Sequence, residues 1–300
     1  MASLDGQPVT EERHPGTIDL DRLSALEFAR LMSGEDARVA VAVAGEAEAI
    51  ATAIDGIATR MQSGGRLIYI GAGTSGRLAV LDASECPATF GTPPELVRAV
   101  MAGGLPALVA PDEDAEDDEA AAAAELRSLD LTAKDSVVGI SASGRTRFVI
   151  GGLREARARG ALVIALCGTR GSPIAELAEI AITPVVGPEV LAGSTRLKAG
   201  TAQKMVLNTL STGVMIRLGK TFGNLMVDVS PKSEKLRERA RRIVEDALGL
   251  SAADADALLQ TTGGNVKVAI VAGLAGVDPG EARRRLEIAN GVVRAALETA

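Results

Sequence analysis

Two short segments combine glycines with hydroxyl side chains directly after apolar runs. The first, GAGTSGR at residues 71–77, follows the apolar run 66–70 and is called the glycine loop. The second, SASGRT at residues 141–146, follows the run 136–140 and is called the serine loop. Glycines let the backbone approach a ligand, and N–H groups at a helix start bind anions. A helix cap would explain either loop alone, whereas both together predict a phosphate site.

The glycine loop also matches the GxGxxG pattern of dinucleotide-binding folds. That pattern requires an acidic residue at the end of the next strand, where it holds the ribose. Here the next apolar run ends in VMAGG, residues 100–104, and contains no acid. The hydroxyls of Thr74 and Ser75 instead suit a terminal phosphate group.

Carboxylates follow both the glycine loop and the next apolar run. Glu85 precedes Pro87, which predicts a helix end there and so places Glu85 near the phosphate. Glu116 belongs to an acidic run at residues 113–119. Acidic residues are favourable at a helix start, which explains most of that run, since one site uses at most two carboxylates.

A third polar segment covers residues 187–204. It places Glu189, Ser194, Arg196 and Lys198 at the start of a long helix predicted over residues 189–218. A surface helix does not need so many small and hydroxyl residues beside two cations. We therefore predict that this helix start contacts the ligand.

Composition excludes several classes of function. The net charge of −7 argues against a nucleic-acid or anionic-membrane surface, and four Phe, one Tyr and no Trp leave no aromatic platform. One histidine, His14, and two cysteines are too few for a zinc site, and His14 lies in a Pro- and Gly-rich stretch unsuited to a Ser-His-Asp triad. We expect no metal and no cofactor. Without a signal-like start or an apolar run of about 18 residues, we expect a cytoplasmic protein.

The elements that position the loops form an alternating pattern. Apolar runs at residues 66–70, 96–101, 136–140, 162–166 and 180–183 alternate with helical patterns, including 120–126 and 145–159. This pattern predicts an α/β fold with a parallel sheet covered on both faces. In such a sheet, loops at the carboxyl ends of the strands face one crevice.

Helical patterns flank this region on both sides. Residues 19–61 predict two helices with a break near Ser33-Gly34. Beyond Pro231 the chain predicts a bundle of short helices, with breaks at Gly249, Gly263-Gly264 and Asp278-Pro279-Gly280.

Four strings together resemble the SIS (sugar isomerase) phosphosugar-binding family and, within it, the N-acetylmuramic acid 6-phosphate etherases. They are residues 71–91 (GAGTSGRLAVLDASECPATFG), 115–118 (AEDD), 137–146 (VVGISASGRT) and 189–229, which begins EVLAGSTRLKAGTAQK. The resemblance implies a doubly wound, five-stranded parallel sheet in residues 63–229, N-terminal helices in 1–62 and a UBA-like helical cap in 230–300. It also implies a homodimer, with the N-terminal helices and the 189–218 helix as candidate contacts.

The resemblance implies a carbon–oxygen lyase that cleaves the D-lactyl ether of N-acetylmuramic acid 6-phosphate in cell-wall sugar recycling. Elimination followed by water addition gives N-acetylglucosamine 6-phosphate and D-lactate. It implies Glu85 and Glu116 as the two catalytic carboxyls; we expect Glu85 to be the acid and Glu116 the base, although sequence alone leaves the order open. The expected substrate-binding residues are Thr74, Ser75, Gly76, Ser84, Ser141, Ser143, Gly144, Thr146, Glu189, Ser194 and Lys198.

Two other functions are compatible with this fold. Relatives include non-catalytic regulatory proteins that sense a phosphosugar, but this chain has no second SIS copy and no DNA-binding motif. A phosphosugar isomerase would share the step that removes a proton next to a carbonyl. Release of lactate distinguishes the etherase from both.

Overall fold

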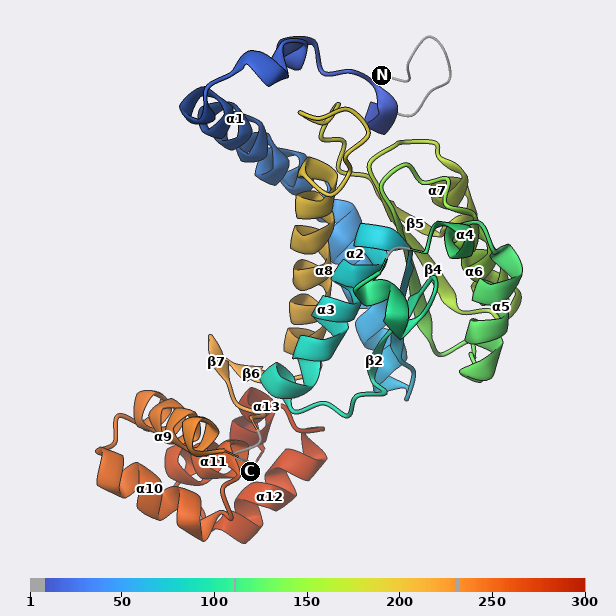
Figure 1. The fold of residues 1–300 in the computed structure, drawn as a ribbon. Coiled ribbons are helices and arrows are strands. Elements are labelled where there is room, and N and C mark those ends of the chain that lie inside the picture. The colour runs from blue at the N-terminus through green and yellow to red at the C-terminus, as the bar shows by residue number, and fades with distance from the viewer. Residues whose placement is uncertain (1–8, 111, 230–232, 300) are drawn as a thin grey trace. The chain divides into compact units, whose positions relative to one another are not determined.

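The computed structural model describes residues 9–110, 112–229 and 233–299 (Figure 1). Its internal contacts divide the chain into two compact units. The first unit comprises Met1–Ser84 and Glu95–Ser211, and contains the sheet. The second unit comprises Glu85–Pro94 and Thr212–Ala300, and contains the C-terminal helices.

A five-stranded parallel sheet lies at the centre of the first unit, as the apolar runs predict. Its order is β2-β1-β3-β4-β5. All residues of β1, β3 and β4 are buried, which explains why their sequences are continuous apolar runs rather than alternating ones. The strands are β1 (Leu67–Gly71), β2 (Val97–Met101), β3 (Ser136–Ser141), β4 (Leu162–Cys167) and β5 (Ile180–Ile182).

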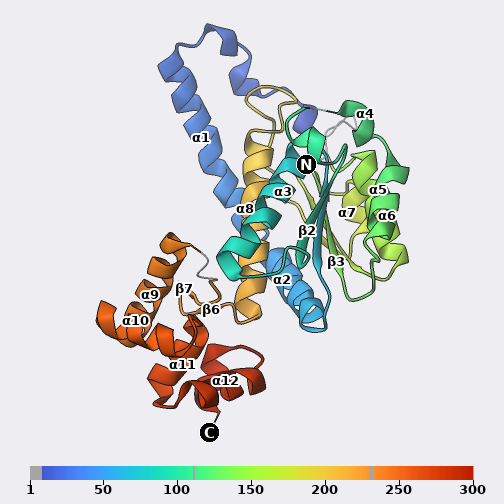
Figure 2. The same ribbon diagram turned by 60° about the horizontal axis from the view of Figure 1, so that its bottom comes forward.

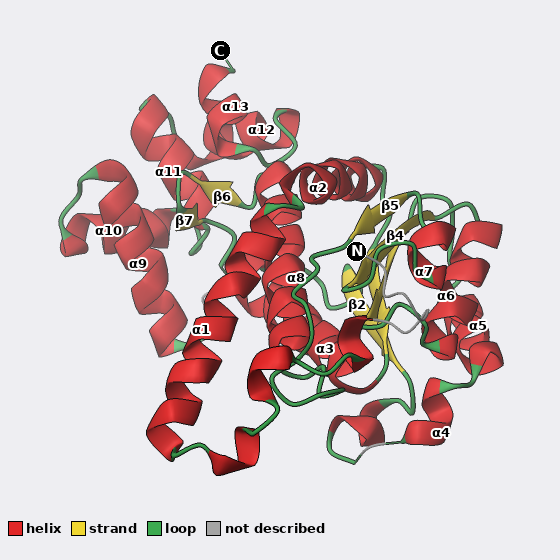
Figure 3. Ribbon diagram, turned by 90° about the horizontal axis from the view of Figure 1, so that it is seen from above, coloured by secondary structure: helices red, strands yellow, loops and turns green. Residues whose placement is uncertain are grey.

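Helices cover both faces of the sheet (Figure 3). Helices α2, α3 and α8 lie on one face, and α5, α6 and α7 lie on the other. The predicted α/β architecture is therefore confirmed. The helices that begin in this unit are α1 (Ala25–Ala44), α2 (Ala47–Gln62), α3 (Gly73–Phe90), α4 (Glu113–Glu116), α5 (Glu119–Ser128), α6 (Arg147–Ala158), α7 (Pro173–Leu177) and α8 (Lys198–Arg217).

The break between the first two helices differs from the prediction. It falls at Gly45 and Glu46 instead of Ser33-Gly34, which lies inside α1. Gly34 is exposed with open space around it, so the helix only bears the modest cost of a glycine there, about 1 kcal/mol. At the true break, the carboxylate of Glu46 accepts a hydrogen bond from the Thr183 backbone N–H at 3.0 Å. A contact with the end of β5 thus accompanies the turn.

Two helix boundaries near the predicted site also differ from expectation. Helix α8 begins at Lys198 rather than Glu189, because Gly193 has a φ of +76° and breaks the preceding segment. Helix α3 continues through Pro87 to Phe90. Pro87 removes one helical N–H, but its carbonyl still accepts from Gly91 N–H at 3.1 Å, and Phe90 is buried. The last turn of α3 is therefore retained.

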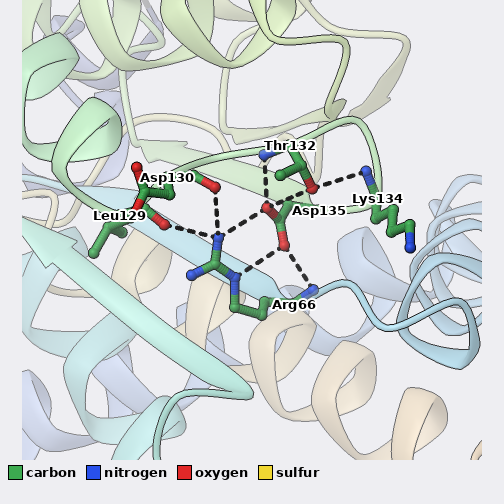
Figure 4. A network of polar contacts seen from close by, with 6 residues as sticks. All are labelled: Arg66, Leu129, Asp130, Thr132, Lys134 and Asp135. Atoms are coloured by element: carbon green, nitrogen blue, oxygen red, sulfur yellow. Dashed lines mark hydrogen bonds and ion pairs between the residues drawn. The ribbon is translucent and has the colours of Figure 1, made fainter.

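An arginine and an aspartate join the starts of β1 and β3 (Figure 4). The backbone N–H and Nε of Arg66 donate to Oδ1 of Asp135 at 2.9 and 3.0 Å, and its Nη2 donates to Oδ2 at 2.9 Å. Thr132 N–H donates to Oδ2 at 2.8 Å. The Asp135 side chain is only 2% exposed. This pair fixes the amino ends of the two strands whose carboxyl ends lead into the glycine and serine loops.

The second unit is a bundle of short helices around α11, preceded by a hairpin that the sequence did not predict. Figure 2 shows α9 and α10 on one side of α11 and α12 on the other. Residues Val266 to Ala272 of α11 are all buried. The predicted breaks are confirmed: Gly249 ends α9 in the left-handed conformation, and Asp278 caps α12. The elements are β6 (Thr221–Phe222), β7 (Leu225–Met226), α9 (Glu234–Leu248), α10 (Ala252–Thr261), α11 (Val266–Ala275), α12 (Pro279–Ile288) and α13 (Val293–Glu298).

Candidate active site

The glycine and serine loops emerge side by side from the sheet. They follow β1 and β3, which are neighbours, with Gly71 opposite Ile140. The chain runs from β1 outward to β2 and then returns to β3 on the other side of β1. Such a reversal of strand order opens a crevice at the carboxyl ends, where open α/β sheets bind ligands. The structure therefore brings both loops to the position that the sheet favours for a ligand.

The glycine loop forms the first turn of α3. Thr74 is partly exposed, whereas Ser75 and Gly76 are buried. The hydroxyl of Ser75 donates to Oε1 of Gln203 on α8 at 2.9 Å. The Ser75 side chain therefore joins α3 to α8. The groups of this loop that suit an anionic ligand are the Thr74 hydroxyl and the N–H groups at the start of α3.

Hydroxyl groups in the serine loop bond to one another rather than to the helix that follows. Ser141 Oγ and Thr146 Oγ1 lie 2.8 Å apart, and Gly144 N–H donates to Ser141 Oγ at 3.0 Å. Thr146 occupies the N-cap position of α6 but makes no capping hydrogen bond. Ser143 is partly buried, and its Oγ accepts from Arg145 N–H at 3.2 Å. Helix capping therefore does not explain why Thr146 carries a hydroxyl.

Glu116 lies against the glycine loop. Gly73 has a φ of +52°, and a Cβ at this position would lie 2.8 Å from Oε1 of Glu116. Burial, followed by the negative charges of Glu113 and Asp117, raises the pKa of the partly buried Glu116, while Arg77 opposes the shift. A carboxyl with a raised pKa beside a ligand loop is suited to proton transfer.

Glu85 and Ser84 are placed differently from the prediction. Both are exposed on α3, and Ser84 Oγ donates to the Leu81 carbonyl at 2.9 Å. A helix rises 1.5 Å per residue, so Glu85 is roughly 18 Å along the axis from Gly73. The expectation that Pro87 ends the helix and leaves Glu85 beside the glycine loop is therefore wrong for this helix.

Glu189 and Lys198 are buried, each 1% exposed. The Glu189 carboxylate accepts from the N–H groups of Lys198 and Ala199 at 3.0 and 2.9 Å, so it caps α8. Lys198 Nζ donates to Oε2 of Glu35 on α1 at 2.6 Å. Both predicted ligand-binding groups hold the fold together here, while Ser194 is partly exposed in the preceding turn.

Sequence reasoning missed two residues that adjoin the site. Arg77 donates through Nε and Nη2 to the carbonyls of Leu108 and Ala107 at 3.0 and 2.8 Å, and its charge acts on Glu116. Its place as the last residue of the glycine loop was the available signal. Gln203 is buried, and its Nε2 has no partner among the described residues. No sequence pattern marks Gln203, because its partner Ser75 lies 128 positions away.

Membrane-spanning helices and metal-binding clusters are both absent from the part of the chain that the structure describes. No helix there combines the length and apolar character needed to span a bilayer. No group of three or more His, Cys, Asp or Glu side chains in residues 9–110, 112–229 and 233–299 is arranged to hold a metal ion.

Known proteins resemble the chain both in parts and as a whole. Residues 48–157 match the glucokinase regulatory protein N-terminal SIS domain, and residues 118–212 match the SIS domain. A phosphoheptose isomerase from Francisella tularensis shares the fold, with a TM-score of 0.52 and 19% identity over 65% of this chain and 100% of its own.

Closely similar curated proteins cover nearly the whole chain. N-acetylmuramic acid 6-phosphate etherase from Rubrobacter xylanophilus is 56% identical over 97% of this chain and 96% of its own length. The etherases from Streptomyces avermitilis and Cronobacter sakazakii are 55% and 52% identical, covering 97% and 98% of this chain and 94% and 99% of their own. The chain thus belongs to the N-acetylmuramic acid 6-phosphate etherase family, whose fold is that of the SIS domain.

Proposed function

We propose that this protein cleaves the D-lactyl ether of N-acetylmuramic acid 6-phosphate in cell-wall amino-sugar recycling. The products are N-acetylglucosamine 6-phosphate and D-lactate. The observation that carries the proposal is the position of Glu116: a carboxyl with a raised pKa rests on a glycine loop at the point where the strand order reverses. Etherases more than half identical to this chain support the choice of substrate.

The chemistry requires proton transfer at two positions of the substrate. An alkoxide is a poor leaving group, but in the ring-opened sugar the carbon 2 proton lies next to an aldehyde and is acidic. A base removes that proton, the bond between carbon 3 and the ether oxygen breaks, and an acid protonates the departing lactate oxygen. Water then adds across the resulting double bond, with hydroxide at carbon 3 and a proton at carbon 2. Two carboxyl groups in different protonation states can carry these steps.

Glu116 is assigned as the base at carbon 2 and Glu85 as the acid at the ether oxygen. Burial and two neighbouring acidic groups raise the pKa of Glu116, so its carboxylate is a stronger base than an ordinary glutamate. The assignment of Glu85 rests on family resemblance alone, because Glu85 is exposed on α3 twelve residues beyond Gly73, the residue that Glu116 contacts.

Release of D-lactate from the phosphorylated substrate is the direct test of the proposed function. The purified protein should liberate one D-lactate per N-acetylglucosamine 6-phosphate formed. A phosphosugar sensor would bind the substrate without releasing lactate, and an isomerase would rearrange the sugar at carbons 1 and 2 and leave its ether intact. Either result would contradict the etherase function.

Substitution of Ser143 by Ala should raise the KM for the phosphorylated substrate by roughly 10- to 100-fold, with a smaller effect on kcat. A hydrogen bond to a charged group is worth about 1.5–3 kcal/mol, and Ser143 is a partly buried hydroxyl of the serine loop. Steady-state kinetics measures the change. Ser128→Ala is the matched control, because Ser128 is exposed on α5 and its hydroxyl donates to the Glu125 carbonyl. Equal KM values for both variants and the unmodified protein would remove Ser143 from the phosphate site.

We also predict a homodimer, of twice 30.7 kDa. Of the twenty residues of α1, only Glu35, Val39 and Val43 are buried, and the helix projects from the rest of its unit (Figure 1). Leu26 and Val41 are 59% and 74% exposed on it. Symmetric dimers are the commonest assemblies, and a second copy would cover these side chains.

Sedimentation equilibrium at micromolar concentration tests the dimer. The unmodified protein should sediment at the dimer mass, and Leu26→Glu should shift the equilibrium toward monomer. Glu48→Gln, on an exposed position of α2, should leave the dimer intact. A monomer mass for the unmodified protein would contradict the prediction.

A further inference from the structure

The second unit contains a cavity that the proposed reaction does not use. Its volume is about 510 Å³, and all of its lining residues belong to the second unit. They come from the segments before and after the β6–β7 hairpin, from the start of α11, and from α12 with the turn that follows it. Small-molecule sites typically measure about 300–1,000 Å³. The cavity is therefore large enough for a ligand of the size of a monosaccharide.

Two lysines that line this cavity share one carboxylate oxygen. Lys220 Nζ and Lys267 Nζ lie 2.9 and 2.6 Å from the same Oδ2 of Asp228. The Lys267 side chain is 10% exposed, and those of Lys220 and Asp228 are 25% and 23% exposed. Two positive charges thus face one negative charge in a partly desolvated place. Burial lowers the pKa of Lys267, although Asp228 opposes the shift.

This surplus of positive charge indicates that the cluster binds an anion in addition to forming an ion pair within the fold. One lysine would suffice to neutralise Asp228, and a second, partly buried ammonium without its own counter-charge costs free energy. Desolvation is the largest of the effects acting on Lys267, so its environment already disfavours the extra charge. An anion in the cavity would neutralise the charge and share the two ammonium groups with Asp228.

The walls of the cavity carry groups that recognise hydroxyls as well as charge. Arg283 and Glu287 on α12 are exposed, and among the described residues neither forms an ion pair; Arg283 Nη2 donates to the Thr262 carbonyl at 2.8 Å. The Asn265 side-chain oxygen accepts from Val268 N–H at 3.0 Å, which leaves its amide N–H groups available. Asn290 completes this wall. Amides and a carboxylate beside cations are the groups that bind a sugar bearing an anionic substituent.

We propose that this cavity binds a phosphorylated monosaccharide, with its phosphate at Lys220 and Lys267 and its hydroxyls toward Asn265, Asn290 and Glu287. A phosphate monoester carries nearly two negative charges at neutral pH and can accept hydrogen bonds from both ammonium groups at once. The protein then has two sites for this class of compound: the one at the glycine and serine loops of the first unit and a separate one in this cavity of the second unit.

Calorimetric titration of the full-length protein with N-acetylglucosamine 6-phosphate tests this proposal through the stoichiometry. The unmodified protein should bind two molecules per chain. Lys267→Met should remove binding in the second-unit cavity and leave the site at the glycine and serine loops. Ser143→Ala should weaken the site at these loops and leave the cavity. The double variant should retain no tight site. Lys235→Met is the matched control, since Lys235 is exposed on α9 outside the cavity and its loss should leave both sites.

Two further variants guard against a loss of folding in Lys267→Met. Lys220→Met removes the more exposed ammonium and should weaken binding at the second site by at least tenfold. Asp228→Asn removes the competing carboxylate and should tighten that site, which a purely structural role for the ion pair would not produce. Unphosphorylated N-acetylglucosamine should not bind there, and inorganic phosphate should compete with the phosphorylated sugar.

A single binding event per chain that Ser143→Ala removes and Lys267→Met leaves unchanged would overturn the proposal. Equal affinity for the sugar with and without its phosphate would likewise overturn the role of the two lysines.

Discussion

Glu116→Gln is expected to abolish both D-lactate release and the exchange of the carbon 2 proton with solvent deuterium. A general base typically contributes about 10²- to 10⁴-fold in rate, so turnover should fall by that factor with little change in KM. Gln is nearly the same size as Glu and keeps the contact with Gly73, but it cannot accept the proton. Lactate is measured enzymatically, and deuterium at carbon 2 by proton NMR of the recovered sugar.

Glu113→Gln is the matched control for this prediction. Glu113 is exposed on the same short helix, and its negative charge contributes to the raised pKa of Glu116. Its removal should leave turnover nearly intact. If Glu116 were only one more favourable charge at a helix start, its loss would cost under about 1 kcal/mol, and Glu116→Gln would also remain active. That result would remove Glu116 from catalysis.

The pH dependence of the reaction provides an independent check. The base must be deprotonated, so activity should disappear as the pH falls through the pKa of Glu116. Because burial and like charges raise this pKa, the loss should occur at a higher pH than for an ordinary glutamate. Glu113→Gln removes one of the like charges and should move the acidic limit to lower pH.

Glu85→Gln separates the two proton transfers. If Glu85 protonates the ether oxygen, this variant should release no lactate yet still exchange the carbon 2 proton, since the base is intact. Exchange lost in Glu85→Gln but kept in Glu116→Gln would reverse the two roles.

Asp135→Asn should lower the free energy of unfolding by about 3–5 kcal/mol at neutral pH, the usual effect of removing one partner from a buried ion pair. Asp135 accepts hydrogen bonds from Arg66 and Thr132 and is almost fully buried. An Asn amide has one acceptor oxygen in place of two and leaves the guanidinium without its counter-charge. Urea unfolding followed by circular dichroism measures the difference.

The sign of the pH dependence follows from the pKa of Asp135. Burial would raise this pKa, but the hydrogen bonds and charge of Arg66 outweigh it and hold the pKa below the ordinary aspartate value. The carboxylate therefore stabilises the fold above the unfolded-state pKa of about 3.9, and the stabilisation is lost as the pH falls toward the lower folded-state value. The difference between Asp135→Asn and the unmodified protein should shrink in that acidic range.

Asp130→Asn provides the control for the ion pair. Asp130 is exposed in the same turn, and only its backbone carbonyl accepts from Arg66. Its φ of 50° is one that Asn also tolerates, and a surface charge contributes at most about 1 kcal/mol. Equal stabilities for Asp130→Asn and Asp135→Asn would show that the buried pair is not what secures the starts of β1 and β3.

Consecutive residues were sufficient to predict the sheet and the two loops. A strand buried on both faces must be apolar throughout, so each strand is visible as a short apolar run. The ends of α9 and α11 are equally local, because Gly249 and Gly276 adopt a left-handed conformation that few other residues tolerate. The parallel direction of the strands followed from the βαβ pattern, which places the glycine and serine loops at the carboxyl edge of the sheet, whereas the strand order β2-β1-β3-β4-β5 came only from the structure.

The partners of buried charges depended on tertiary structure. Lys198 was predicted to meet a ligand, but it pairs with Glu35, 163 positions earlier in the chain. Glu85 is close to the glycine loop in sequence, but both lie on the continuous helix α3. Each helical residue adds 1.5 Å along the axis, so Glu85 is far from Gly73. Local propensity depends on neighbouring residues, whereas the environment of a charge depends on elements that only folding brings together. The Lys220, Asp228 and Lys267 cluster, like the raised pKa of Glu116, follows from that packing and from no motif.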